Sequence, residues 1–294
     1  MQVLEAAVGQ SANPWPLRRE RAAELAERYP HAAEMLRLYQ ALSVVQERAF
    51  EQAREIFPSP SGGGQGGGIA EFAATRVLPL VVDATVSSGP VRLRDGVISV
   101  FCSADLVNLL QRWLDGQLLT PVETYLARAS ASPLLEAQLT PGPHPALPHR
   151  GREMMPPQVG REIMAPQRGR VMYECPACGG LPQLSYFAVS VEALVSGPRY
   201  LVCSRCAYNW VFARMTCAGC GESTGAKLPI YQEQERFPHV RVDGCHSCRK
   251  YLLTFDLRRD TSAVPVVDEI AALPLDLFAR DQGLTKITPN LMGN

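Results

Sequence analysis

The sequence predicts an α+β protein, with an N-terminal all-α domain followed by two small tandem β modules that each contain four cysteines. Apolar residues at helical spacing extend over roughly 16–132. A segment rich in Pro, Gly and Arg follows, and four Cys-x-x-Cys pairs lie beyond it. Because 46% of the 294 residues are hydrophobic, the chain can form more than one core.

The N-terminal domain is predicted over 1–135. Its longest helix is expected between Pro30 and Pro58, since proline is tolerated at a helix start and ends a helix further on. In this helix apolar residues recur at spacings of three and four, namely Met35, Leu38, Leu42, Val45, Ala49, Ala53 and Ile56. A shorter helix is predicted over 17–28.

The rest of this domain contains breaks in the helical pattern. A run of glycines predicts a flexible loop over 58–69. The stretch from Ile69 to Val82 contains Pro79 and predicts a broken helix. Residues 105–129 again show helical spacing, divided by Gly116 and Pro121.

A linker is predicted over 136–170. It contains a near-repeat, in which six of eight positions match between 151–158 and 160–167. The segment has too little apolar surface to fold alone, so it is read as an expanded linker, with a basic docking tether as the alternative.

Eight cysteines form four Cys-x-x-Cys pairs with a repeated spacing. The second and third cysteines of each set of four are separated by 24 residues in both sets. Two such pairs complete a four-thiolate metal site. The first site is predicted as Cys175, Cys178, Cys203 and Cys206, and the second as Cys217, Cys220, Cys245 and Cys248.

These sites predict two β modules of the rubredoxin-like or zinc-ribbon-like kind, over 171–215 and 216–260, with a helical tail over 261–294. Each pair is expected to form a tight turn, in which Gly179 and Gly221 adopt a positive φ. Four thiolates suit zinc and iron equally, so the residues alone leave the metal open. Thiol–disulfide exchange is less favoured, because all four pairs lie in strand-and-turn sequence and not at a helix N-terminus.

Other candidate side chains indicate no catalytic site. Cys102 stands alone and is expected to be a small buried residue. His246 lies inside a cysteine pair but is expected at the surface or behind the ligands. The remaining histidines show no ligand spacing, and no nucleophile or phosphate-loop motif is present. The protein is therefore predicted not to be an enzyme.

The charge balance argues against a nucleic-acid partner. The chain has 29 Lys+Arg and 29 Asp+Glu, and the stretch 171–260 has ten against eight, a net charge of +2. The sequence shows no signal peptide or membrane span, which predicts a cytoplasmic protein. A nucleic-acid-binding zinc ribbon and a small electron-transfer or thiol redox protein are the alternatives, and a homodimer is left open.

The cysteine segments resemble the formate dehydrogenase accessory proteins of the FdhE type. The resemblance rests on Cys175-Pro-Ala-Cys-Gly, on the stretch 199–210 with its Cys-Ser-Arg-Cys pair, on Cys217-Ala-Gly-Cys and on 242–252. The tail from Asp268 and the final Pro-Asn-Leu-Met-Gly are also similar. The glycine run and the linker repeat are departures from the family pattern.

The resemblance implies a non-enzymatic maturation factor, a chaperone-like protein of the bacterial cytoplasm. Such proteins contact the catalytic subunit of a respiratory formate dehydrogenase and are needed for its activity. It also implies that the two groups of four cysteines hold iron in a rubredoxin-like manner, with zinc as a substitute.

Overall fold

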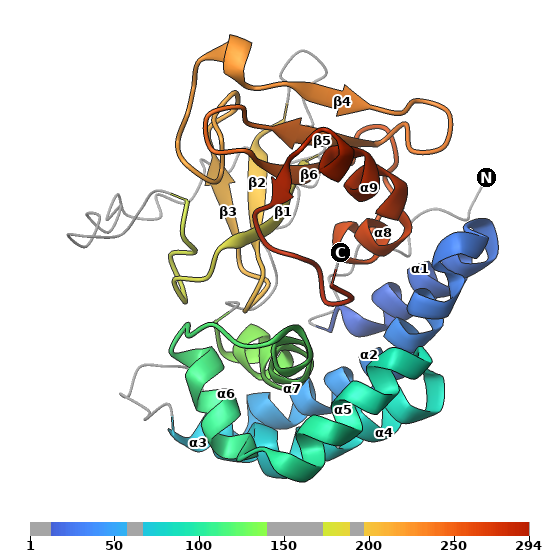
Figure 1. Cartoon of the computed structure of the whole chain (residues 1–294), viewed down its shortest axis with the longest axis vertical. Helices are drawn as coiled ribbons and strands as arrows, with labels where there is room; N and C mark the ends of the chain where they lie inside the picture. Colours follow the sequence, from blue (N-terminus) through green and yellow to red (C-terminus); the bar gives the residue numbers. More distant parts are fainter. Residues whose placement is uncertain (1–12, 58–66, 140–172, 189–196, 294) are drawn as a thin grey trace, which may run out of the picture.

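The computed structural model describes residues 13–57, 67–139, 173–188 and 197–293. The N-terminal helices form one layer and a β-sheet forms another, with two C-terminal helices between the sheet and the helix α1 (Figure 1). The predicted loop residues 58–66 and the linker repeat at 151–167 lie outside the described residues.

The helical layer contains the predicted helices and one more. Its helices are α1 (Trp15–Arg28), α2 (Ala33–Ile56), α3 (Gly67–Phe72), α4 (Leu78–Ser88), α5 (Val91–Ser103), α6 (Leu106–Leu114) and α7 (Pro121–Leu139), with a 3₁₀ turn at Pro30–Ala32. None of the helices in the described ranges has both the length and the apolar character needed to cross a membrane.

The break predicted near Pro79 falls just before it. A π-helical segment, Ala73–Val77, separates α3 from α4, and Pro79 lies in the first turn of α4. Its missing N–H is tolerated there, because the first N–H groups of a helix have no partner within that helix.

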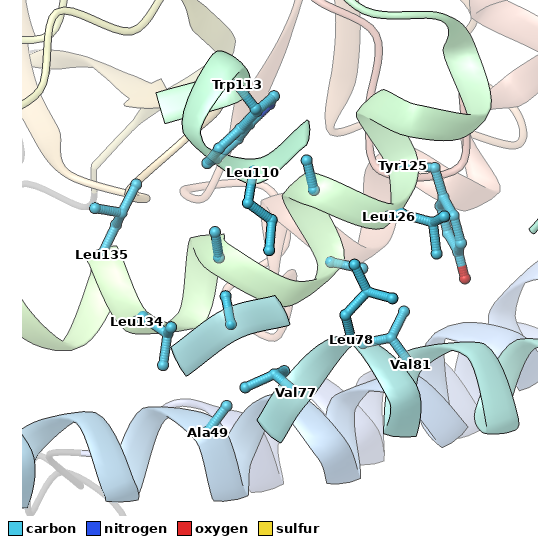
Figure 2. Packing of buried hydrophobic residues seen from close by; sticks show 14 of the residues in the cluster. Ala49, Val77, Leu78, Val81, Leu110, Trp113, Tyr125, Leu126, Leu134 and Leu135 are labelled. Atoms are coloured by element: carbon cyan, nitrogen blue, oxygen red, sulfur yellow. The ribbon is translucent and has the colours of Figure 1, made fainter. Parts of the chain in front are cut away.

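The helix α2 is buried on two sides. Leu42 and Ala49 face a core shared with α4, α6 and α7, where Leu78 and Leu134 pack nearby (Figure 2). Leu36 and Tyr39 face a second core, shared with α1, the sheet and the tail. The predicted stripe is thus only part of the buried surface, and its last member, Ile56, is exposed because it lies at the end of the helix.

The two cysteine units share one sheet. Its strands are β1 (Pro182–Phe187), β2 (Arg199–Cys203), β3 (Asn209–Phe212), β4 (Ile230–Gln232), β5 (Val240–Gly244), β6 (Lys250–Asp256) and β7 (Thr285–Lys286). They run in the order β3-β2-β1-β6-β5-β4, with β7 beside β6. Pairing is antiparallel within each unit, whereas β1 and β6 join the units in parallel, with Leu184 opposite Leu253.

The tail connects the sheet to the helical layer. It contains α8 (Pro265–Ala271) and α9 (Leu273–Asp281), whose residues Val267, Ile270 and Leu275 enter the second core. At its end the buried Lys286 Nζ lies 2.7 Å from Glu269 Oε1 and 3.0 Å from Asp276 Oδ1. Tyr251 of β6 also donates to Asp276.

The expectation for Cys102 is wrong. Its side chain is exposed near the end of α5, whose one fully buried apolar residue is Val97. The two residues are five positions apart in the chain, which corresponds to about 140° around a helix. Cys102 therefore faces away from the core.

Candidate metal centres

All four cysteine pairs form the same backbone turn. The N–H of the first cysteine bonds to the carbonyl five residues later, at 2.8–2.9 Å. The N–H of the residue after the second cysteine bonds back to the first cysteine's carbonyl, at 2.9–3.2 Å. The turns begin at Cys175, Cys203, Cys217 and Cys245.

The residue after each second cysteine has left-handed backbone. It is Gly179 (φ 72°), Ala207 (φ 55°), Gly221 (φ 78°) and Arg249 (φ 58°) in the four turns. The positive φ predicted for the two glycines is therefore present. The sequence carries no such signal at Ala207 and Arg249, where the repeated turn imposes a conformation that side chains disfavour.

The turns bring the sulfur atoms together in two groups of four. Within each group the Sγ atoms lie within 4.8 Å of one another. The Sγ atoms of Cys178 and Cys203 are 3.4 Å apart, and three other pairs of Sγ atoms, Cys175–Cys206, Cys217–Cys248 and Cys220–Cys245, are 3.7 Å apart.

These distances fit a tetrahedral metal site. Four sulfurs at about 2.3 Å from a central ion lie about 3.8 Å from one another. Both groups could therefore hold a metal ion with little rearrangement, and an S₄ donor set suits zinc or iron. That the eight cysteines are ligands stays a prediction.

Comparison with known proteins assigns this region to one family. Residues 174–214 match the model of the FdhE central domain, and residues 215–292 match that of the FdhE C-terminal domain. Residues 174–292 are of the FdhE type. These two matches contain all eight paired cysteines and most of the tail.

Curated relatives match the same part of the chain. A "Protein FdhE homolog" of Aquifex aeolicus is 34% identical over 119 residues, which is 40% of this chain and 41% of the relative. The homolog of Pseudomonas putida is 33% identical over 122 residues, which is 40% of this chain and 38% of the relative. The chain thus matches about two fifths of these relatives' length.

The fold extends further than the sequence match. The crystal structure of the FdhE protein from Pseudomonas aeruginosa covers 96% of this chain and is itself covered to 96%, with a TM-score of 0.61 and 21% identity. The helical layer of this chain therefore has the same architecture as that crystal structure.

The first group of cysteines is largely covered by the helical layer, with Cys178 half-buried. Cys175, Cys203 and Cys206 are fully buried in the core that contains Trp113. Arg205, inside the second turn, donates to the carbonyls of Trp113 and Leu114 at 2.7 and 2.5 Å. Its positive charge lies at the C-terminus of α6, where the helix dipole favours a cation.

The second group of cysteines lies at the surface. Cys220 is exposed and Cys248 is half-buried, whereas Cys217 and Cys245 are buried. Ser247, inside the last turn, donates to Glu222 at 2.6 Å and so ties the two turns together. His246 is exposed, as expected for a residue outside the ligand set.

Without a cation, the thiols of one group cannot all ionise. The hydrogen bond with Cys175 lowers the pKa of Cys178, whereas the bond with the same residue raises the pKa of Cys206. Some thiols of the group are thus stabilised as thiolates by neighbours that stay protonated. A bound metal ion reverses this, because it is held by all four groups as thiolates.

Sequence reasoning found no role for His239, which the structure places beside Asp260 and Asp268. A cation is already present there, because Arg21 Nη2 lies 2.5 Å from Asp268 and 3.0 Å from Asp260. This group therefore ties α1 to the tail. No local signal could reveal it, since Arg21 and Asp268 are 247 residues apart.

Proposed function

We propose that this chain is a non-enzymatic accessory factor of a formate dehydrogenase. It binds the catalytic subunit of the respiratory enzyme in the bacterial cytoplasm and is needed for that subunit's activity. The FdhE domain matches over 174–292 carry this proposal, because they contain both cysteine groups and the tail that fixes them to the helices.

The four cysteine thiolates of each group support a metal site that does not catalyse hydrolysis. Four protein thiolates fill a tetrahedral site, whereas a catalytic zinc site keeps one position for water or substrate. We propose that Cys175, Cys178, Cys203 and Cys206 hold one iron ion, and that Cys217, Cys220, Cys245 and Cys248 hold the other. Iron bound in this way supplies one-electron chemistry or a rigid surface.

The two sites differ in what can reach them. The first is largely covered by α6 and its neighbours, so we propose that it fixes the sheet to the helical layer. The second exposes Cys220 and is the site that a partner subunit can contact.

Co-purification tests the accessory role. The tagged chain is expressed in its own bacterium, and the captured material is probed for the formate dehydrogenase catalytic subunit. We expect the subunit to be captured, and we expect deletion of the gene to abolish formate oxidation. Normal formate oxidation in the deletion strain would contradict the proposal.

An optical spectrum tests the metal separately. Protein purified without oxygen is expected to show ferric-thiolate absorption that bleaches on reduction. Colourless protein with two zinc ions per chain would overturn the assignment of iron and leave the accessory role standing.

A further inference from the structure

A cavity of about 260 Å³ lies on the sheet face opposite α8 and α9, next to the second cysteine group. Its floor includes Leu252, and Cys217 is part of its wall. A cavity of roughly 150 Å³ suffices to hold benzene, so this one accommodates an aromatic ring with a polar substituent.

The cavity carries a surplus of positive charge. Arg199, Arg214, Arg241 and Lys250 line it, and the one acidic residue among the lining residues is Asp243. The difference between four cations and one anion is a charge of +3. A divalent ion held by four thiolates in the adjoining cysteine group would add −2, so a surplus of +1 remains, in a chain whose formal net charge is zero. Such a concave surface concentrates anions.

The single carboxylate is already satisfied. Asp243 Oδ2 accepts bonds from Arg199 at 3.2 Å, from Arg241 at 3.3 Å and from Thr254 at 2.7 Å. Arg199 is buried, and it is held on its other side by Ser185 and by the carbonyl of Thr216. The carboxylate therefore organises Arg199 and Arg241, whereas Arg214 donates to the carbonyl of Gly197.

Lys250 is the cation best placed for that ligand. It lines the cavity half-buried, and its ammonium group forms no hydrogen bond or ion pair with the residues that the structure describes. A partly buried ammonium without a partner loses hydrogen bonds to water, and a bound oxyanion would replace them.

We propose that this cavity binds a small organic oxyanion, with its carboxylate or phosphate group at Lys250 and the arginines and its apolar part over Leu252. The proposal goes beyond the accessory role, since the ligand is recognised by charge and size alone. Carboxylate and phosphate share this chemistry, and the experiment distinguishes them.

Binding is measured by calorimetry on the full, metal-loaded chain with benzoate, phenyl phosphate and the neutral benzamide. We expect at least one anion to bind at least about tenfold more tightly than benzamide, with an affinity that falls as salt rises. A preference for benzoate assigns a carboxylate ligand, and a preference for phenyl phosphate assigns a phosphate. Equal or weaker binding of both anions overturns the proposal.

Two variants locate the bound anion. Lys250→Gln and Arg214→Gln are each expected to weaken anion binding about tenfold, whereas Lys250→Arg retains it. Lys227→Gln is the matched control, because this lysine is exposed and pairs with Glu222 outside the cavity. Metal content is measured for each variant. Unchanged affinity in both Lys250→Gln and Arg214→Gln, with metal retained, contradicts the assignment.

Discussion

At the scale of single residues, the four cysteine turns show a backbone requirement that outweighs side-chain preference. The same left-handed position is filled by glycine in the first turn of each unit and by Ala207 or Arg249 in the second. Left-handed backbone costs a non-glycine residue about 1–2 kcal/mol. The hydrogen bonds of each turn, and any metal that it holds, must offset this cost.

Gly221→Ala measures that cost directly. The added Cβ would meet no heavy atom within 4 Å, so its effect comes from the backbone and not from a clash. We expect the free energy of unfolding to fall by about 1 kcal/mol, measured by denaturant titration. Ala207→Gly at the equivalent position is the control and should not destabilise the protein. A neutral Gly221→Ala would show that the turn relaxes.

Cys175→Ser tests the ligand assignment. Loss of one thiolate should reduce the bound metal from two ions per chain to one, because metal binding and local folding are coupled. Cys102→Ser is the matched control, since this exposed cysteine belongs to neither group. Two metal ions and an unchanged melting curve in Cys175→Ser would show that the first site is assigned wrongly.

At the scale of elements, the tail is held by buried charges. Lys286, with a side chain 3% exposed, faces the two carboxylates of Glu269 and Asp276, which are both fully buried. Burial raises the pKa of Glu269, and Lys286 is the main group that opposes this rise. The three side chains therefore stabilise the tail only as a set.

Lys286→Met should destabilise the protein by about 3–5 kcal/mol, because it removes the cation that is in direct contact with two buried carboxylates. The exposed Lys227→Met, which breaks a surface pair with Glu222, should cost less than about 1 kcal/mol. Both are measured as free energies of unfolding.

The stability of the Lys286→Met variant should also depend on pH. Without Lys286 the pKa of Glu269 rises further, so the folded variant takes up a proton at a pH where the unfolded chain does not. Stability then increases as pH falls through this window. The deficit of Lys286→Met should therefore shrink as the pH is lowered from neutral towards the ordinary pKa of a glutamate. A deficit that grows with acidity would contradict this account.

The elements also show what the sequence can predict. The helices and the cysteine turns follow from local patterns, because spacing and turn residues act over a few positions. The single sheet does not, since its central pairing joins Leu184 to Leu253 without any local signal. The second buried face of α2 escaped prediction for the same reason, because the tail and sheet that cover it come more than a hundred residues later.

At the scale of the whole molecule, the two cysteine groups lie in different environments. Three cysteines of the first group are at most 2% exposed, under the helical layer, whereas Cys220 of the second is exposed. The half-buried Cys178 is the most accessible ligand of the first group, which contains no exposed cysteine. The two sites should therefore exchange metal at different rates.

A colour-forming chelator should release metal from the full chain in two phases. The fast phase is expected from the second site and the slow phase from the first. Cys217→Ser should then retain only the slow phase, and Cys175→Ser only the fast one. A single phase in the unmodified chain, or the reverse assignment in the two variants, would refute the difference in access.

The order of the strands has a consequence for self-association. In each unit three strands follow the first cysteine pair, so β1, β2 and β3 of the first unit correspond to β4, β5 and β6 of the second. The junction therefore pairs the first strand of one unit, β1, with the last strand of the other, β6. This junction is head to tail and not twofold. Such a junction is open at both ends, and identical copies could in principle extend it into a fibre. On β6 the junction is formed by residues 253–256, which are the fifth to eighth residues after Cys248. The equivalent residues of the first unit, counted from Cys206, are 211–214. The strand β3 ends at Phe212, halfway through them. This early strand end removes half of the equivalent pairing positions from β3.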